Sequence, residues 1–196
     1  DSNDAILNAQ IIYNCKITPN ISGCKSKYNV SYGDKPFSLN ANSETELSYT
    51  SDNTKVAEVS DDGTVTVNSV GVATITITSV GDNVYNPATK KVIINVQKAS
   101  QKITGVKSKY EVVHIAKSLK LDAKAKTAIS YSSDNNSVAE VSSNGTVTIN
   151  GVGTATVTVT AEETENYNSV TKKVNIEVKD TTNTYTAVGD ASFLHA

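Results

Sequence analysis

The sequence predicts an all-β protein built from two tandem β-sandwiches, with short strand-like extensions at both ends. Two observations support this fold class. Val or Ile alternates with Thr, Lys or Asn through most of the chain, and one long stretch of sequence occurs twice. The alternation, as in "GTVTVNS" and "VATITIT", has the period of two that turns one face of a strand to a core and the other to water. No segment shows a sustained helical period.

The repeat relates two halves of the chain at a constant separation of 82 positions, as from Tyr28 to Tyr110. Roughly half of the aligned positions are identical, and the alignment needs no gap. A period of this length approaches the size of a small domain, so it indicates tandem domains rather than a solenoid. We therefore expect, with almost no linker near residues 99–102, an N-terminal extension at 1–20, domains at 21–100 and 101–182, and a tail at 183–196.

The number of strands narrows the architecture. Alternating apolar runs between turn signals give about seven short strands in each half, which is typical of an immunoglobulin-like sandwich. The runs are short and are separated by Gly, Asn, Asp and Ser, the residues that turns require.

One hairpin can be predicted to the residue. In "EVSDDGTVTV", a three-residue loop at 61–63 places Val59 opposite Val65, whereas a two-residue turn would mix apolar and polar faces. Gly63 then takes a left-handed backbone conformation that a β-branched residue adopts only at a cost. The remaining glycines predicted to serve such turns are the equivalent Gly145 and the second repeated pair, Gly71 and Gly153.

Residues 51–78, with the halves "VAEVS..GTVTV" and "GVATITIT", resemble the signature of the group 2 bacterial immunoglobulin-like domains, and residues 133–160 resemble it again. The similarity extends over residues 21–98 and 103–180. Such domains occur in tandem in surface adhesins, in intimin-like and invasin-like proteins, in phage structural proteins and as spacers beside carbohydrate-active enzymes. The resemblance implies an extracellular or bacterial cell-surface module, without identifying a ligand.

The two cysteines, Cys15 and Cys24, flank the segment "KITPNISG". A tight turn at Pro19 and Asn20 would set the cysteines opposite each other, at a separation that a disulfide bridges. We expect this disulfide in an exported protein. Free thiols in a reducing cell and covalent links between subunits are the alternatives.

The two ends of the chain have no counterpart in the repeat. "IIYNCKIT" alternates like a strand, which is open to two interpretations: a strand added to the edge of the first sandwich, or a strand offered to another subunit, as in fibres that assemble by strand donation. The residues that would be donated are Ile11, Ile12, Tyr13 and Ile17. In the tail, Phe193 and Leu194 are expected to be docked or buried in a partner.

Few residues are candidates for catalysis. Glu58 and Glu140 recur at equivalent positions, but a lone carboxylate on the outer face of a sheet is typical of a solvated charge. His114, in "VVHIA", is predicted to be a half-buried strand residue, and His195 lies far from it in the sequence. Because the sequence has no nucleophile elbow and no phosphate-binding loop, we expect no enzyme and no cofactor.

Acidic loop residues give a weak calcium candidate centred on Asp61 and Asp62, to which Asp52 and Asp82 could add oxygen ligands. The second copy lacks the two central carboxylates. Turn chemistry alone explains an Asp before Gly.

The composition argues against several classes of partner. The formal net charge is −2 and the chain contains no Arg, so nucleic acid is not an expected partner. The sequence contains no apolar run of about 18 residues, so we expect no membrane insertion within this segment. The chain begins at Asp1 without any Met, which suggests a processed or excised segment. The absence of Trp argues against a sugar-binding platform, although Tyr85 and Tyr167 lie in loop-like segments and could be exposed.

These observations predict a non-enzymatic spacer or stalk of a bacterial surface protein. Two alternatives stay open. One is a subunit that self-assembles into an extracellular fibre through its N-terminal strand. The other is an adhesin or carbohydrate-binding module for a protein or glycan receptor.

Overall fold

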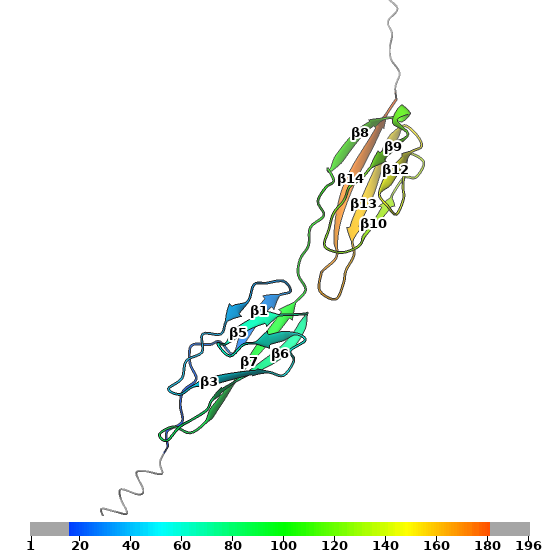
Figure 1. The fold of residues 1–196 in the computed structure, drawn as a ribbon. Helices are drawn as coiled ribbons and strands as arrows, with labels where there is room; N and C mark the ends of the chain where they lie inside the picture. Colours follow the sequence, from blue (N-terminus) through cyan, green and yellow to red (C-terminus); the bar gives the residue numbers. More distant parts are fainter. Residues whose placement is uncertain (1–15, 181–196) are drawn as a thin grey trace, which may run out of the picture. The chain divides into compact units, whose positions relative to one another are not determined.

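A computed structural model describes residues 16–180 as two β-sandwiches of seven strands each, without an α-helix in that range (Figure 1). This confirms the predicted fold class and the number of strands. Contacts divide the chain into two compact units: the first comprises the chain up to Ser100 together with Glu163–Asn168, and the second begins at Gln101.

The first sandwich has a four-stranded sheet in the order β1-β7-β6-β3 and a three-stranded sheet in the order β2-β5-β4. β1 runs parallel to β7, and the other neighbouring strands are antiparallel. The strands are β1 (Lys27–Ser31), β2 (Phe37–Ser38), β3 (Leu47–Ser51), β4 (Ala57–Val59), β5 (Thr64–Val67), β6 (Gly71–Ser79) and β7 (Ala88–Gln97).

The second sandwich repeats this topology, with sheets in the orders β8-β14-β13-β10 and β9-β12-β11. It adds one 3-10 turn, η1, directly after its first strand. The elements are β8 (Lys109–Val113), η1 (His114–Ala116), β9 (Ser118–Lys120), β10 (Ile129–Ser133), β11 (Ala139–Val141), β12 (Thr146–Ile149), β13 (Gly153–Ala161) and β14 (Val170–Lys179).

The predicted hairpin has the predicted register. Val59 lies opposite Val65, and the loop closes where the Gly63 N–H donates to the Ser60 carbonyl at 2.9 Å. Gly63 has φ +77° and its equivalent Gly145 has φ +82°, so both take the left-handed conformation expected of them. The alternation of apolar residues therefore fixed the register correctly, because each apolar residue on β5 needs an apolar partner on β4.

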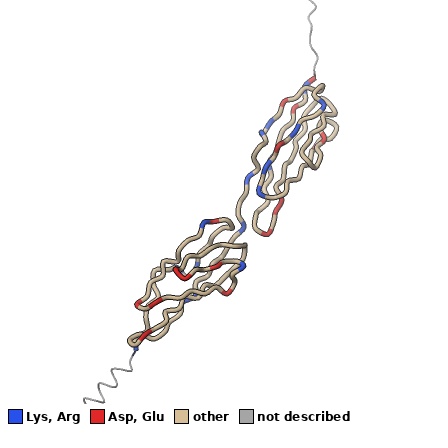
Figure 2. The backbone as a smooth tube through the Cα atoms, viewed as in Figure 1, with Lys and Arg blue, Asp and Glu red and all other residues tan. Residues whose placement is uncertain are grey.

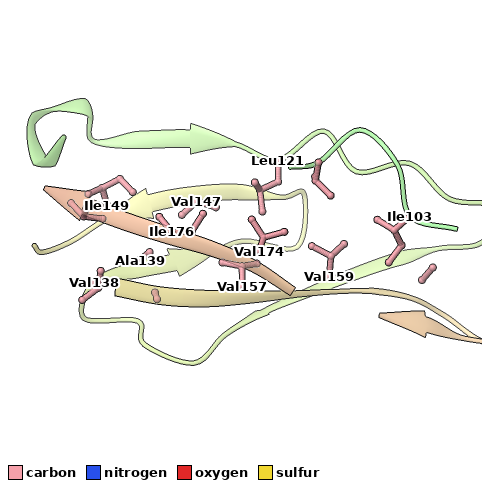
Figure 3. Close-up of a cluster of buried hydrophobic side chains, with 14 residues drawn as sticks. Ile103, Leu121, Val138, Ala139, Val147, Ile149, Val157, Val159, Val174 and Ile176 are labelled. Carbon is pink, nitrogen blue, oxygen red and sulfur yellow. The ribbon is translucent and has the colours of Figure 1, made fainter. Parts of the chain in front are cut away.

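Each core fills the space between the two sheets of its sandwich. The longest strands show the period directly: β6 and β13 share one burial pattern, in which every second residue from Ala73 and from Ala155 is buried. Figure 3 shows the core of the second unit, in which Val174 and Ile176 of β14 pack with Leu121 and Val147. Nearly the same set of positions, 82 residues earlier, forms the core of the first unit.

Two buried polar residues interrupt the apolar cores, one in each unit. Ser79 is fully buried in the first unit and bonds to the hydroxyls of Ser43 and Thr45. Gln101 is buried in the second unit, and its side-chain amide donates to Thr127 Oγ1 at 3.0 Å and to the Glu162 carbonyl at 3.2 Å. Both are stable inside the fold because their polar atoms are hydrogen-bonded.

Candidate functional site

The polar motif Ser-Asp-Asn begins at the last residue of β3 in the first copy and of β10 in the second, where the chain crosses from one sheet to the other. Ser51 Oγ donates to the Ala57 carbonyl at 2.6 Å, and the Asp52 carboxylate accepts the Thr74 N–H at 2.7 Å. The Asn53 carbonyl accepts the N–H groups of Val56 and Ala57, at 3.0 and 3.1 Å, and the Asn53 N–H donates to Ser51 Oγ at 3.2 Å. The motif thus holds the two sheets together at the crossing.

The second copy repeats the same contacts. Ser133 Oγ donates to the Ala139 carbonyl at 2.6 Å, and Asp134 accepts the Thr156 N–H at 2.6 Å. Hydrogen bonds from this backbone N–H lower the pKa of Asp134, and the Thr74 N–H lowers the pKa of Asp52 in the same way. The Ser and the Asp of this motif therefore form hydrogen bonds within their own sandwich in both copies. The sequence did not predict the role of this motif, since its partners lie on a different strand.

The weak calcium candidate falls in the β4–β5 loop. One oxygen of Asp62 accepts from Ser60 Oγ at 2.5 Å and from the Thr64 N–H at 3.0 Å, and these two bonds lower the pKa of its carboxyl. Asp82 instead binds the N–H groups of Val84 and Tyr85, each at 2.7 Å, in another loop. Within residues 16–180, no group of three or more His, Cys, Asp or Glu side chains gathers in a way that could hold a metal ion.

The turn predicted at Pro19 and Asn20 is not present. Ile17 lies opposite Tyr85, and Ser22 lies opposite Asn42, whereas a tight turn would have paired Ile17 with Ser22. Residues 17–22 are extended along the sandwich, because the backbone groups of Ile17 and Ser22 are hydrogen-bonded to these partner segments and because Pro19 is buried. Cys24 is half-buried and forms no disulfide with any residue between 16 and 180. Cys15 lies outside the described residues, so the disulfide stays a prediction.

The proposed donor strand is only partly described. Ile17 has 58% of its surface exposed, but its N–H donates to Val84 and its carbonyl accepts from Asn86, at 2.9 and 2.8 Å. It is thus tied into its own unit. The other residues of the donor prediction, Ile11, Ile12 and Tyr13, lie outside the described residues, as do Phe193 and Leu194 of the tail.

An open cavity of about 380 Å³ lies between this extended segment and the start of β7. At its wall, Lys90 Nζ donates to the carbonyls of Ile21 and Cys24, at 3.0 and 3.3 Å. The equivalent Lys172 donates to the Val106 carbonyl at 2.6 Å. In both copies this lysine fastens the segment before the first strand, a role that sequence reasoning missed because a lysine in a strand reads as a solvated residue.

The candidate catalytic residues are dispersed. Glu58 and Glu140 are exposed at the middle of β4 and β11, as predicted for outer-face carboxylates. His114 is half-buried, as predicted, but it begins the turn η1 and is not part of a strand. β8 ends at Val113, and the chain turns there next to the loop that follows β12: His114 Nε2 lies 3.4 Å from the Asn150 carbonyl.

The aromatic residues give no exposed cluster among residues 16–180, where every Tyr and Phe is half-buried. Tyr85 and Tyr167, for which exposure was suggested, are half-buried too. Each is held by its own loop: the Tyr85 N–H donates to Asp82, and the Tyr167 N–H donates to Thr164 Oγ1 at 3.1 Å. The receptor-binding alternative stays a prediction.

A ladder of four charges lies on the β8–β14 pair of the second unit. Lys109 Nζ contacts Glu111 at 2.7 Å and Glu177 at 2.5 Å, and Lys179 Nζ contacts Glu111 at 2.8 Å. The two lysines lower the pKa of Glu111 to about 2, and Glu111 raises the pKa of Lys109. Figure 2 shows basic and acidic residues interspersed over both units, and this ladder follows the same pattern. The first unit has an amide pair in its place, Asn95 donating to Asn29 at 3.0 Å.

Residues 16–180 contain no helix that is long and apolar enough to cross a membrane.

Several solved structures match this chain at low identity and with low TM-scores. Drosophila N-cadherin EC1-3 is 16% identical with a TM-score of 0.36, covering 83% of this chain and 68% of that one. The S-layer protein SbsC domains 4 and 5 are 20% identical with a TM-score of 0.37, covering 73% of this chain and 78% of that one. BT4661, a SusE-like surface located polysaccharide binding protein from Bacteroides thetaiotaomicron, is 14% identical with a TM-score of 0.31, covering 85% of this chain and 35% of that one. These similarities are too distant to assign a function.

A search of curated proteins found no match. Family models match both copies of the repeat. Residues 30–92 match the bacterial Ig-like domain (group 2), and residues 117–163 match the intimin immunoglobulin-like domain. Both matches fall inside seven-stranded sandwiches with the same topology. The chain is therefore a tandem of bacterial immunoglobulin-like domains, one matching the group 2 family and the other the intimin family.

Proposed function

We propose that this chain is a non-enzymatic spacer of a bacterial surface protein, which holds another part of that protein away from the cell. The family matches support a surface location, since intimin-type domains form one of the two families. The spacer role rests on one observation: a Ser, an Asp and a Lys that the two copies share each bind another part of their own sandwich.

Three contacts carry this observation. The shared Ser of the crossing motif binds the following strand, the shared Asp of the motif caps a backbone N–H, and the shared Lys fastens the segment before the first strand. Loop residues differ between the two copies, as Asp61 and its equivalent Ser143 do. Duplication has thus preserved what folds the domain, and a spacer requires nothing more.

The role can be tested by display on a bacterial surface. An epitope is anchored to the cell wall through zero, one or two copies of the repeat, and the binding of an antibody to the epitope is measured. A spacer makes the epitope more accessible with each copy. An unrelated sandwich of equal length serves as the control and must restore the same accessibility. If the unrelated sandwich fails while this chain succeeds, the chain contributes a specific contact and the spacer proposal is wrong.

The second candidate is a fibre subunit. The observation that favours it is the composition of the edge strands β3 and β10, "LSYTS" and "ISYSS", which contain none of the charged residues or prolines that usually protect an edge. Size-exclusion chromatography with light scattering decides between the candidates, on the full chain and on a chain lacking residues 1–15. The spacer predicts a monomer in both samples. Large oligomers that disappear on truncation would establish the fibre.

A further inference from the structure

The sequence contains two Asn-Gly pairs, at residues 144–145 and 150–151, and both lie in the second unit. In such a pair the backbone nitrogen of the glycine can attack the side-chain carbonyl carbon of the asparagine. An N–C bond forms, ammonia leaves, and water then opens the resulting succinimide ring to give aspartate or isoaspartate. Glycine favours this reaction because it has no side chain to hinder the approach of its nitrogen. The two reacting atoms must also be able to meet, so the fold decides which pair reacts.

The first pair is held tightly by the β11–β12 hairpin. Gly145 is buried, and its N–H donates to the Ser142 carbonyl at 2.9 Å. The side-chain oxygen of Asn144 accepts Ser142 Oγ at 2.7 Å and the Thr146 N–H at 3.0 Å. A β-carbon built on Gly145 would be 2.8 Å from the Tyr131 ring, so the glycine backbone is packed against that ring. Both reacting groups are therefore fixed in the folded hairpin.

The second pair is held less tightly, in the loop that follows β12. Gly151 is half-buried, and its N–H donates to the Val138 carbonyl at 3.3 Å, which is long for such a bond. The same carbonyl also accepts the Asn150 N–H, at 2.9 Å. The Asn150 side chain is bound through its nitrogen, since Nδ2 donates to the Asn136 carbonyl at 2.8 Å. Of the two glycine nitrogens, that of Gly151 is thus the easier to release from its hydrogen bond.

The first unit has the same arrangement without the glycine. Asn68, the equivalent of Asn150, donates from Nδ2 to the Thr54 carbonyl at 2.9 Å, and the Ser69 N–H donates to the Val56 carbonyl at 3.3 Å. The two asparagines therefore have matching contacts and differ in the residue that follows them. The side chain of Ser69 hinders the attack, and its hydroxyl is also bound, to the Lys55 carbonyl at 2.7 Å.

We propose that Asn150 is a site of spontaneous deamidation in the folded protein, whereas Asn144 is protected by its hairpin. The reaction consumes only water and releases ammonia. In the product, a carboxylate oxygen replaces the Nδ2 donor and faces the Asn136 carbonyl, so a hydrogen bond becomes a contact between two acceptors. The lost bond joins the loop after β12 to the loop before β11, and deamidation therefore weakens the second unit. This inference does not depend on the spacer role.

Mass spectrometry of the full chain, kept folded in mildly alkaline buffer, tests the proposal. Cleavage after glutamate releases residues 141–162, whose only asparagines are Asn144 and Asn150, so fragment masses assign each conversion. We expect Asn150 to be converted while Asn144 stays intact. In urea, which removes the hairpin, both should be converted at similar rates. The proposal is wrong if Asn144 reacts as fast as Asn150 in the folded chain, or if Asn150 reacts no faster than Asn68.

The matched variant is Ser69→Gly, which gives the first copy the glycine of the second. Asn68 should then be converted at a rate close to that of Asn150, and an unchanged rate at Asn68 would overturn the proposal. The reverse variant, Gly151→Ser, should slow the conversion of Asn150 to the rate of Asn68. A β-carbon built on Gly151 would be 2.8 Å from the Ser137 carbonyl, so the loop must shift slightly in this variant. Ser69→Gly introduces no such contact and is the decisive test.

Two aspartate variants measure the effect of the product on stability. Asn150→Asp should lower the urea midpoint of the second unit, because the bond to the Asn136 carbonyl is lost. Asn144→Asp is the control and should leave the midpoint unchanged. The first copy already has Asp62 at that position, and its carboxylate accepts the equivalent two bonds. Equal midpoints in the two variants would show that deamidation at Asn150 does not weaken the unit.

Discussion

The backbone of Gly63 lies directly against the ring of Tyr49. A β-carbon built on Gly63 would be 2.9 Å from Cζ of that ring, and one built on Gly145 would be 2.8 Å from Cζ of Tyr131. The same glycine–tyrosine contact therefore closes the β4–β5 hairpin and the β11–β12 hairpin over the neighbouring sheet.

Gly63→Ala should destabilise the first unit by about 2–3 kcal/mol, because the new methyl group meets the Tyr49 ring and because a left-handed conformation costs a non-glycine residue about 1–2 kcal/mol. Gly33→Ala is the matched control. Gly33 has φ +84° with open space around a built β-carbon, so only the conformational cost of about 1–2 kcal/mol should remain. Amide hydrogen exchange, resolved by unit, measures both. Equal losses in the two variants would show that the ring contact is unimportant.

Ser51→Ala should destabilise the first unit by about 1–2 kcal/mol, since it removes the hydroxyl that bonds the Ala57 carbonyl and the Asn53 N–H at the crossing between the sheets. Ser133→Ala should do the same in the second unit. Ser48→Ala, at an exposed position of the same strand, should change stability by less than about 0.5 kcal/mol. Urea unfolding of each variant provides the test, and a Ser51 variant as stable as the Ser48 variant would refute the role of the motif.

Ser79→Ala should cost about 1–2 kcal/mol, because it leaves the hydroxyls of Ser43 and Thr45 without their buried partner. The second copy has Ala at both positions equivalent to Ser43 and Ser79. The double variant Ser43→Ala with Ser79→Ala should thus cost less than the sum of the single variants. A double-mutant cycle measures this coupling. Simple additivity would show that the two hydroxyls do not act together.

Glu111 should make the second unit acid-sensitive. Its pKa is about 2 in the folded protein against an ordinary value of 4.5, so the stability it contributes is present above pH 4.5 and is lost as the pH falls toward 2. Glu111→Gln should flatten this part of the pH dependence, and added salt should reduce it, because the ladder is exposed. Carbon-detected NMR titration of the Glu111 carboxyl checks the pKa directly. A titration near pH 4.5 would contradict the ladder.

The fold was predictable from the sequence where the information is local. The β4–β5 register follows from alternation around one turn, since a shift by one residue would turn Val65 to solvent. The duplication then transfers each such inference to the second unit. The number of strands follows for the same reason, from runs bounded by turn residues.

The sequence predictions that were wrong concern residues whose partners lie far away in the sequence. Local chemistry favours a turn at Pro19 and Asn20, but no turn forms there, because Ile17 pairs with Tyr85 and Ser22 pairs with Asn42. His114 continues an alternating run, yet the strand ends before it, because the loop that follows β12 meets the chain there. No local pattern contains such long-range contacts, and the roles of Ser51 and Lys90 were hidden for the same reason.

The parallel pairing of β1 with β7 has a mechanical consequence. The first and last strands of the first sandwich lie side by side and point the same way, with Lys27 opposite Ile93 and Ser31 opposite Gln97. A pull on the two ends of the chain draws these strands in opposite directions along their length, so the hydrogen bonds between them are loaded together in shear instead of opening one by one. β8 and β14 repeat this arrangement. Each domain therefore resists tension as a clamp, and the tandem should remain folded under forces that would unzip a hairpin.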